Sequence, residues 1–158
     1  MARLIIASEK KWEQRFLELA HTVSNWSRDP STKVGAVIAT DDNRILSLGF
    51  NGFPKGVDDI ESRYANRELK YKLVCHAERN ALDNANFNLS GAILYSTMFT
   101  CNECAKSVIQ RGIKVVVTPK PDLNNDKYNW KEALLMYKEA DVIVRFVEPV
   151  EAKLNSMP

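Results

Sequence analysis

The sequence predicts an α/β fold, a three-layer α/β/α sandwich on a mixed five-stranded sheet. The first observation is a pair of neighbouring β-rich segments separated by a short polar stretch, which is typical of an antiparallel hairpin. The second is a regular alternation of strand-like and helix-like segments in the second half of the chain, which favours right-handed crossovers and parallel strands. An antiparallel hairpin followed by three parallel strands accounts for the five predicted strands.

The first predicted element is an amphipathic helix that begins at Ser8, whose hydroxyl can cap it. Apolar residues recur in it at alternating steps of four and three, with charged and polar residues between them. We expect this stripe to pack in the core and to have no catalytic role. Its members are Trp12, Phe16, Leu19, Val23 and Trp26.

The hairpin is predicted over 33–39 and 44–50, on either side of a Thr-Asp-Asp-Asn turn. Segment 51–74 has no clean period, and we interpret it as a long functional loop with a helical piece at 64–71. The remaining predicted elements are a helix over 76–84, a strand over 92–96, a helix over 101–111 ending at Gly112, a strand over 114–117, a helix over 129–139 and a strand over 142–147.

The 158 residues are expected to form one domain, with a core over about 8–147 and a loose polar tail over 148–158. Twenty-two Lys and Arg against 20 Asp and Glu give a net charge of +2, and their even spread argues against a polynucleotide groove.

The N-terminal apolar run is too short for a secretory signal or a membrane span, so we expect a cytoplasmic protein. In a reducing compartment, three cysteines favour metal binding or catalysis over disulfides.

Cys101 and Cys104 lie three residues apart at a predicted helix start, so both sulfurs can face one side of its first turn. The positive end of the helix dipole favours the thiolate, which is the form that binds zinc, although redox sites share this C-x-x-C spacing. His76 lies at another predicted helix start. Because helix starts that follow strands gather at one edge of an α/β sheet, these three side chains predict a zinc site.

Three protein ligands indicate a catalytic zinc, because a structural zinc needs four while a catalytic one keeps a position for water. Two further side chains could in principle supply a fourth ligand. Cys75 adjoins His76, so in an extended segment it points to the opposite face, and we interpret it as a buried structural thiol. His21 lies beside the apolar stripe of the first helix and is expected to be packed or on the surface.

Glu78 is the candidate proton carrier. Two residues after His76 on an ideal helix it would face away from the metal, so His76 has to lie at the irregular start of the helix. In that arrangement zinc lowers the pKa of its water toward about 7, and the hydroxide attacks a ring carbon that bears an amine. Glu78 then returns protons to the ring nitrogen and the departing ammonia. The alternative is a glutamate that merely complements the helix dipole.

Four blocks carry a family resemblance: SRDPSTKVGAVI at 27–38, LGFNGFPKG at 48–56, CHAERNAL at 75–82 and TCNECAKSVIQRGIKVVV at 100–117. The last two resemble the zinc-deaminase signature H-x-E followed by P-C-x-x-C, with Thr100 in the place of the proline. Together the blocks resemble the deoxycytidylate (dCMP) deaminases of the cytidine deaminase-like superfamily, over about residues 12–146. The resemblance implies hydrolysis of dCMP to dUMP and ammonia, which supplies dUMP for thymidylate synthesis.

The resemblance also implies roles for individual residues. His76, Cys101 and Cys104 would hold one catalytic Zn²⁺ per subunit, with Glu78 as the proton shuttle. The substrate-binding candidates are Asn51, Ala77, Arg28 and Tyr128, with Asn51 at the sugar or phosphate and the last two at the phosphate. Two alternatives stay open, because Asn51 and Gly52 could be a turn pair and Arg28 could belong to a helix exit.

Members of the resembled family are commonly homo-hexamers, and many are activated by dCTP with a divalent ion such as Mg²⁺ and inhibited by dTTP. Asn51, Gly52 and Lys55 lie in the region that would contribute to such an effector site. The chain departs from the family pattern at Thr100, where proline is usual; a threonine hydroxyl can instead cap the following helix. Segment 51–74 contains neither Cys nor His, so no second zinc is expected.

Two kinds of alternative remain. A deaminase of the same superfamily could act on dCTP, cytidine, a free base or an adenosine in tRNA, although a tRNA enzyme should present a basic face. A non-enzymatic module stabilised by zinc would need a fourth protein ligand, and its function would not depend on Glu78.

Overall fold

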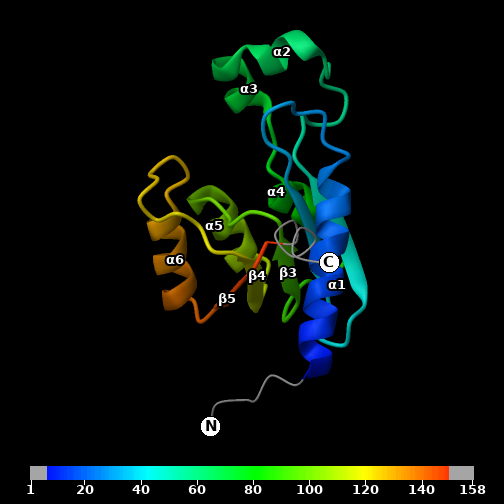
Figure 1. Ribbon diagram of the computed structural model, residues 1–158, viewed down its shortest axis with the longest axis vertical. Helices are drawn as coiled ribbons and strands as arrows, with labels where there is room; N and C mark the ends of the chain where they lie inside the picture. The colour runs from blue at the N-terminus through cyan, green and yellow to red at the C-terminus, as the bar shows by residue number, and fades with distance from the viewer. Residues whose placement is uncertain (1–6, 150–158) are drawn as a thin grey trace, which may run out of the picture.

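The computed structural model describes residues 7–149, whose strands form one mixed sheet between layers of helices (Figure 1). This arrangement confirms the predicted α/β/α sandwich. The predicted tail, 148–158, lies almost entirely outside the described residues. In chain order the elements are α1 (Ala7–Ser24), β1 (Gly35–Ala39), β2 (Ile45–Phe50), α2 (Glu61–Ala65), α3 (Arg67–Leu73), α4 (Ala77–Asn84), β3 (Ile93–Ser96), α5 (Asn102–Gln110), β4 (Val115–Pro119), α6 (Trp130–Glu139) and β5 (Ile143–Val147).

The sheet has the strand order β2-β1-β3-β4-β5. Strand β1 pairs antiparallel with β2, from Gly35 opposite Phe50 to Ala39 opposite Ile45, and also antiparallel with β3. Strands β3, β4 and β5 are parallel to one another. The predicted hairpin and the three predicted parallel strands are therefore confirmed, with ends that differ from the predicted ranges by one or two residues.

The two faces of the sheet bury alternate residues of the same strands, as the two-residue period of a strand requires. Helix α1 covers one face, where it packs on side chains from β1, β3 and β4. Helices α4, α5 and α6 cover the other face and bury the alternate positions. The first face includes Val37, Ala39, Tyr95, Val115 and Val117, and the second includes Ala36, Ile38, Leu94 and Val116.

The predicted buried face of α1 is wrong at both ends. Phe16 and Val23 are buried as predicted, but the face continues through Leu17 and Ala20. Trp12 is 37% exposed, and Trp26, which lies beyond the end of the helix, is 55% exposed. The described part of the helix begins at Ala7, and the predicted cap at Ser8 falls on a side chain outside those that the structure describes. The large aromatic residues dominated the apolar pattern, whereas the helix packs closely on β1 at Ala20, whose carbonyl oxygen would overlap a Cβ placed on Gly35.

The long segment between β2 and α4 contains two short helices, α2 and α3, where one helical piece was predicted. The side chain of Asn66 accepts a hydrogen bond from the N–H of Leu69 (3.2 Å) and so caps α3. Both helices project beyond the end of the sheet (Figure 1). In the part of the chain that the structure describes, no helix combines the length and apolar character that crossing a membrane requires.

Candidate metal centre and substrate cavity

His76 lies immediately before α4, in extended conformation (φ −70°, ψ 156°), and the helix begins at Ala77. The residue before it, Cys75, forms an isolated bridge with Gly52, in which its N–H donates to the Gly52 carbonyl (2.8 Å). This bridge fixes the direction in which the chain enters α4. The irregular helix start that the sequence argument required is therefore present.

The second helix start is built by the cysteines themselves. Cys101 is the N-cap of α5, and its sulfur accepts a hydrogen bond from the backbone N–H of Cys104 (3.4 Å). Thr100 is not the cap, so the predicted capping role of its hydroxyl is wrong. Because a cap residue and the third residue of a helix lie on the same side of its first turn, the two sulfurs converge.

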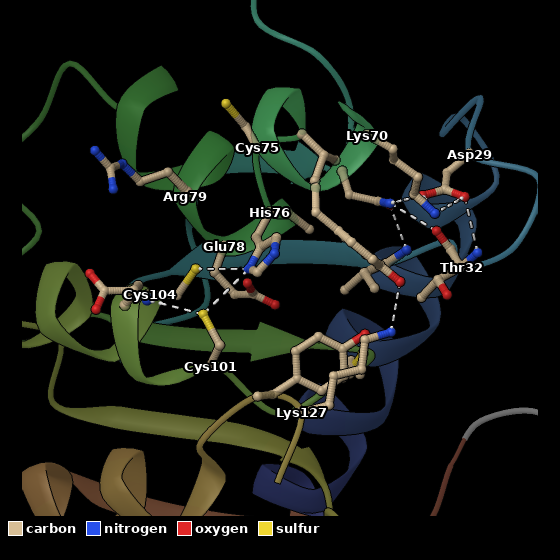
Figure 2. A pocket seen from close by; sticks show the side chains of 18 of the residues that line it. Asp29, Thr32, Lys70, Cys75, His76, Glu78, Arg79, Cys101, Cys104 and Lys127 are labelled. Atoms are coloured by element: carbon tan, nitrogen blue, oxygen red, sulfur yellow. Dashed lines mark hydrogen bonds and ion pairs between the residues drawn. The ribbon is translucent and has the colours of Figure 1, made fainter. Parts of the chain in front are cut away.

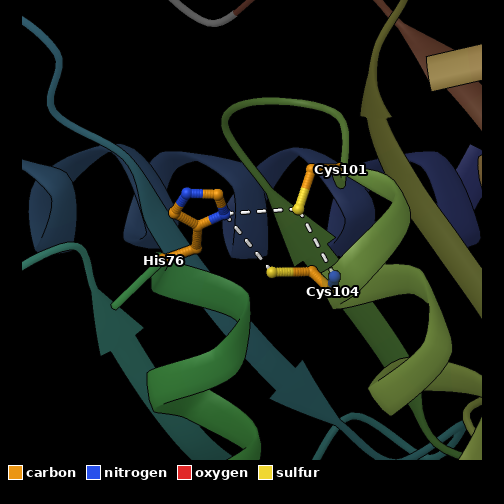
Figure 3. A group of neighbouring side chains, drawn as sticks. All are labelled: His76, Cys101 and Cys104. Carbon is orange, nitrogen blue, oxygen red and sulfur yellow. Dashed lines mark hydrogen bonds between the residues drawn. The ribbon is translucent and has the colours of Figure 1, made fainter. Parts of the chain in front are cut away.

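The three predicted ligand side chains meet at one point (Figure 3). Nδ1 of His76 lies 3.4 Å from Sγ of Cys101 and 3.4 Å from Sγ of Cys104. The ligand atoms all lie within 4.8 Å of one another. A tetrahedral zinc at about 2.0 Å from nitrogen and about 2.3 Å from sulfur would separate these atoms by about 3.5 Å. The donor set, one imidazole and two sulfurs, therefore fits zinc in both spacing and chemistry.

Within the cluster itself, the three side chains shift one another's pKa values through their contacts. Hydrogen bonds from the Cys104 thiol and from His76 lower the pKa of Cys101 to about 4. The pKa of Cys104 is raised, because its contact with Cys101 and its burial oppose a second thiolate. The hydrogen bond to Cys101 raises the pKa of His76. A divalent cation at this point would instead favour two thiolates and a neutral imidazole, which are the forms in which these side chains bind zinc.

Glu78 is 3% exposed and lies next to the ligand cluster (Figure 2). The hydroxyl of Ser96, at the end of β3, donates a hydrogen bond to its Oε1 (3.0 Å). Burial raises the pKa of the Glu78 carboxyl, and the neighbouring His76 opposes that shift. The structure thus places a buried, oriented carboxyl group beside a potential metal site.

A cavity of about 690 Å³ opens onto this cluster and extends to the loop that follows α1. Figure 2 shows His76, Glu78 and the two cysteines at one end, Lys70, Asp29 and Thr32 at the other, and Lys127 below them. We call the end with the predicted zinc ligands the metal end, and the starts of α4 and α5 supply it. The opposite end is supplied by the loop before β1, by α3 and by the loop before α6.

A buried ion pair supports the second end of the cavity. Nζ of Lys70 lies 2.8 Å from Oδ2 of Asp29, and the two residues are 4% and 1% exposed. The Asp29 carboxylate also accepts hydrogen bonds from the N–H groups of Ser31 (2.9 Å) and Thr32 (3.2 Å). Burial opposes ionisation of Asp29, but the contact with Lys70 and these two N–H groups outweigh it, so its pKa is lowered.

Asn51 joins this network through its side-chain amide. Its Oδ1 accepts from the N–H of Val34 (2.8 Å), and its Nδ2 donates to the carbonyl of Thr32 (2.8 Å). Asn51 is 6% exposed and lines the cavity. Neither Asn51 nor Gly52 has a positive φ, so the turn-pair alternative is wrong. Asn51 instead holds the loop before β1 in place.

The other predicted substrate-binding residues divide into two groups. Ala77 and Tyr128 line the cavity. Arg28 is exposed and lies outside the cavity lining, because the adjacent Asp29 turns inward and neighbouring side chains of this irregular segment point in opposite directions. The effector candidates Gly52 and Lys55 also lie outside the lining, and Lys55 is exposed.

The two other potential ligands lie away from the cluster. Cys75 points away from the metal ligands, as expected from its position next to His76 (Figure 2). It is half-buried, so the prediction of a buried thiol is wrong. His21 lies in the last turn of α1 and borders a different cavity, beside Lys33 and Thr97.

Sequence reasoning missed several residues of the cavity. Asp29 carried a recognisable signal, since an Asp followed by small hydroxyl residues is typical of a side-chain-capped turn. Lys70 carried none, because a lysine is rarely buried and its partner lies 41 positions away. Ser96, Arg67 and Tyr71 were also missed, because only the folded chain brings them to the cavity or to Glu78.

Comparisons with known proteins agree with this site. Residues 10–120 match the family described as the cytidine and deoxycytidylate deaminase zinc-binding region. The deoxycytidylate deaminase of Mus musculus is 40% identical over 154 residues, which cover 91% of this chain and 84% of that protein. A deaminase of Aliivibrio fischeri, described as uncharacterized, is 48% identical over 110 residues, 70% of this chain and 74% of its own length.

A similar fold occurs in the dCMP deaminase of the cyanophage S-TIM5, solved in complex with dCMP and dUMP. It superposes with a TM-score of 0.70 at 24% identity, and the match covers 91% of this chain and 100% of the cyanophage chain. At that identity the comparison supports the fold.

Proposed function

Because the chain belongs to the cytidine and deoxycytidylate deaminase family of zinc-dependent enzymes, we propose that it hydrolyses dCMP to dUMP and ammonia. The observation that supports this most is the meeting of three metal ligands and a buried glutamate at one end of a cavity that has cationic side chains at its other end. A ligand with an amine-bearing ring and a phosphate would place its ring at the first end of the cavity and its phosphate at the second. Several similar proteins are named deoxycytidylate deaminases, and the cyanophage relative binds dCMP and dUMP.

The proposed chemistry depends on His76, Cys101 and Cys104 as the zinc ligands. Zinc held by them would lower the pKa of a coordinated water toward about 7. Glu78 would take a proton from that water and deliver protons to the ring nitrogen and to the leaving ammonia. Ser96 fixes Oε1 of Glu78, which leaves Oε2 to exchange these protons. The overall reaction consumes one dCMP and one water and yields one dUMP and one ammonia.

Lys127 is the phosphate-binding residue that the contacts favour over Arg28. Its Nζ lies 3.0 Å from the hydroxyl of Tyr71 and about 5 Å from the ring centroids of Tyr71 (5.0 Å) and Tyr128 (5.1 Å). By contrast, the cation of Lys70 is paired with Asp29, and that of Arg79 with Asp83. An ammonium held by neutral partners can bind an anion without breaking an ion pair. We assign the phosphate to Lys127 and Tyr128, and the sugar to the wall formed by Asn51 and Ala77.

The regulatory properties of the resembled family are also part of the proposal. We propose a cytoplasmic homo-hexamer that is activated by dCTP with Mg²⁺ and inhibited by dTTP, with Asn51, Gly52 and Lys55 near the effector. Phe53, between these residues, stacks on Tyr64 of α2 with ring centroids 4.4 Å apart, which supports a link between this loop and α2. Light scattering with and without dCTP and Mg²⁺, together with turnover in dTTP, would test these properties.

A panel of cytosine compounds tests the substrate. Ammonia release should be fastest, as kcat/KM, for dCMP when it is compared with deoxycytidine, cytidine, dCTP and cytosine. Losing the contact of a charged phosphate costs about 1.5–3 kcal/mol, so deoxycytidine should fall about 10- to 150-fold below dCMP. Equal values for deoxycytidine and dCMP would refute a phosphate-binding end while leaving the deaminase assignment intact.

Replacing Glu78 tests the chemistry. Glu78→Gln keeps the shape of the side chain and removes the proton carrier, so kcat should fall about 10²- to 10⁴-fold while zinc content stays at the wild-type level. The matched control is Glu132→Gln, an exposed glutamate in the first turn of α6, which should leave kcat unchanged. Wild-type turnover by Glu78→Gln would refute the role of Glu78.

A further inference from the structure

The turn that contains Cys101 is hydrogen-bonded to α6 and to the loop before α6. Residues on either side of this cysteine form hydrogen bonds with residues between 128 and 137. The position of Cys101 is therefore not determined by α5 alone. The bonds are Trp130 Nε1 to the carbonyl of Phe99 (3.3 Å), the hydroxyl pair Thr100 and Tyr137 (2.7 Å), Asn102 N–H to the carbonyl of Tyr128 (3.2 Å), and Asn129 Nδ2 to Oδ1 of Asn102 (3.2 Å).

The bond between Thr100 and Tyr137 joins two residues whose exposed fraction is 0%. Each hydroxyl supplies a partner for the other, and neither remains unsatisfied. The ring of Tyr137 also packs edge-on against Phe99, with centroids 6.1 Å apart. Because unpaired buried hydroxyls are costly, this pair specifies one arrangement of Thr100 relative to α6.

Thr100 precedes a metal ligand at a position where the resembled family pattern has proline. A proline ring would restrict the backbone there by fixing φ. Threonine has no ring, and its hydroxyl does not cap α5, because Cys101 occupies the N-cap position. The hydrogen bond to Tyr137 is therefore the restraint that the Thr100 side chain supplies next to Cys101.

We propose that Thr100 and Tyr137 are positioning residues for the metal: their hydrogen bond fixes the backbone of Cys101 and so keeps its sulfur in place to share zinc with His76. This inference rests on zinc binding at the proposed site and is independent of the substrate. Its test is therefore zinc affinity measured without any nucleotide, so a wrong assignment of dCMP would leave it untouched.

The experiment compares Thr100→Val, Tyr137→Phe and the double variant. Each single variant leaves one buried hydroxyl unpaired, so both zinc affinity and the stability of the metal-free protein should fall. Partners that orient a metal ligand commonly contribute about 10- to 100-fold to affinity, and a loss in that range is expected in competition with a chromogenic chelator. The double variant has no unpaired hydroxyl, so its stability should recover in part while its zinc affinity stays low.

Two controls separate positioning from general stability. Val37→Ala removes buried volume under α1, on the opposite face of the sheet, and should lower stability without lowering zinc affinity. Thr100→Ser keeps the hydroxyl and should retain zinc affinity near the wild-type value. Wild-type affinity in the double variant, or an affinity that follows stability through all variants including Val37→Ala, would overturn the proposal. If Thr100→Val does not fold, Tyr137→Phe decides the question, since it preserves the ring.

Discussion

Replacing Lys70 should destabilise the protein far more than a lysine substitution usually does. Lys70→Met keeps most of the aliphatic side chain but leaves Asp29, which is 1% exposed, without its counter-ion. Breaking a buried ion pair costs about 3–5 kcal/mol. Asp29 keeps the N–H groups of Ser31 and Thr32, so we expect the lower value, about 3 kcal/mol. In a chain of this length that loss corresponds to a decrease in Tm of about 6–12 °C.

The loss of stability in Lys70→Met should become smaller as the pH falls. In the wild type the pKa of Asp29 is lowered from its ordinary 3.8, so the pair stabilises the fold above that pH and the contribution is lost as the pH falls through the folded value. Without Lys70, burial dominates and the pKa of Asp29 rises. The variant can then protonate Asp29 in the folded state, so the deficit should shrink between pH 7 and pH about 4.5.

Urea denaturation of the wild type and the variant at both pH values measures this deficit. Lys72→Met is the control, because Lys72 lies on the same helix in an exposed pair with Glu68, and its loss should cost less than about 0.5 kcal/mol. Asp29→Asn with Lys70→Met removes both charges and should recover most of the stability. A deficit below about 1 kcal/mol, or one that is equal at both pH values, would refute the reasoning.

Three further predictions concern the phosphate contact, the packing of β2 on α4 and the metal. Lys127→Met should raise the KM for dCMP about 10-fold or more and leave kcat/KM for deoxycytidine unchanged, whereas Arg28→Met should change neither; steady-state kinetics with both substrates checks this. Gly49→Ala should lower the Tm measured by calorimetry, because a Cβ there would overlap the backbone of α4 at Ala77 and Ala81; an unchanged Tm would contradict that packing. Removing zinc with a chelator should abolish ammonia release and lower the Tm, and added zinc should restore both; turnover that survives verified metal loss would exclude a zinc-dependent reaction.

The fold and the clustering of His76 with Cys101 and Cys104 could be predicted because their signals are local. The alternation of elements identified the parallel strands, and the spacing of Cys101 and Cys104 identified one helix start. The position of Glu78 was stated as a requirement on His76, and the structure meets it. Local signals failed where burial depends on distant elements, as in α1, where Trp12 and Trp26 matched the helical period but lie near the surface.

The end of the cavity that we assign to the phosphate depends on contacts between distant segments. Lys70 is buried only because Asp29 lies opposite it, and Lys127 reaches the cavity only because the loop before α6 folds back toward α3. In the sequence, basic residues in or near predicted loops all look alike, so these two lysines cannot be distinguished there from Arg28 or Lys55. All four side chains carry a positive charge, and it is their neighbours in the fold that distinguish the buried or cavity-lining positions from the exposed ones.

The two ends of the cavity are built on different parts of the fold, which bears on substrate specificity. The metal end is built on the starts of α4 and α5, which pack on the sheet, so changes there would disturb both the core and the chemistry. The opposite end is built on the loop before β1, on α3 and on the loop before α6, and the last two segments meet through the contact of Lys127 with Tyr71. Substitutions in these two segments can alter the phosphate contacts while the ligand cluster stays intact. We therefore expect changes of substrate to come from α3 and from the loop before α6.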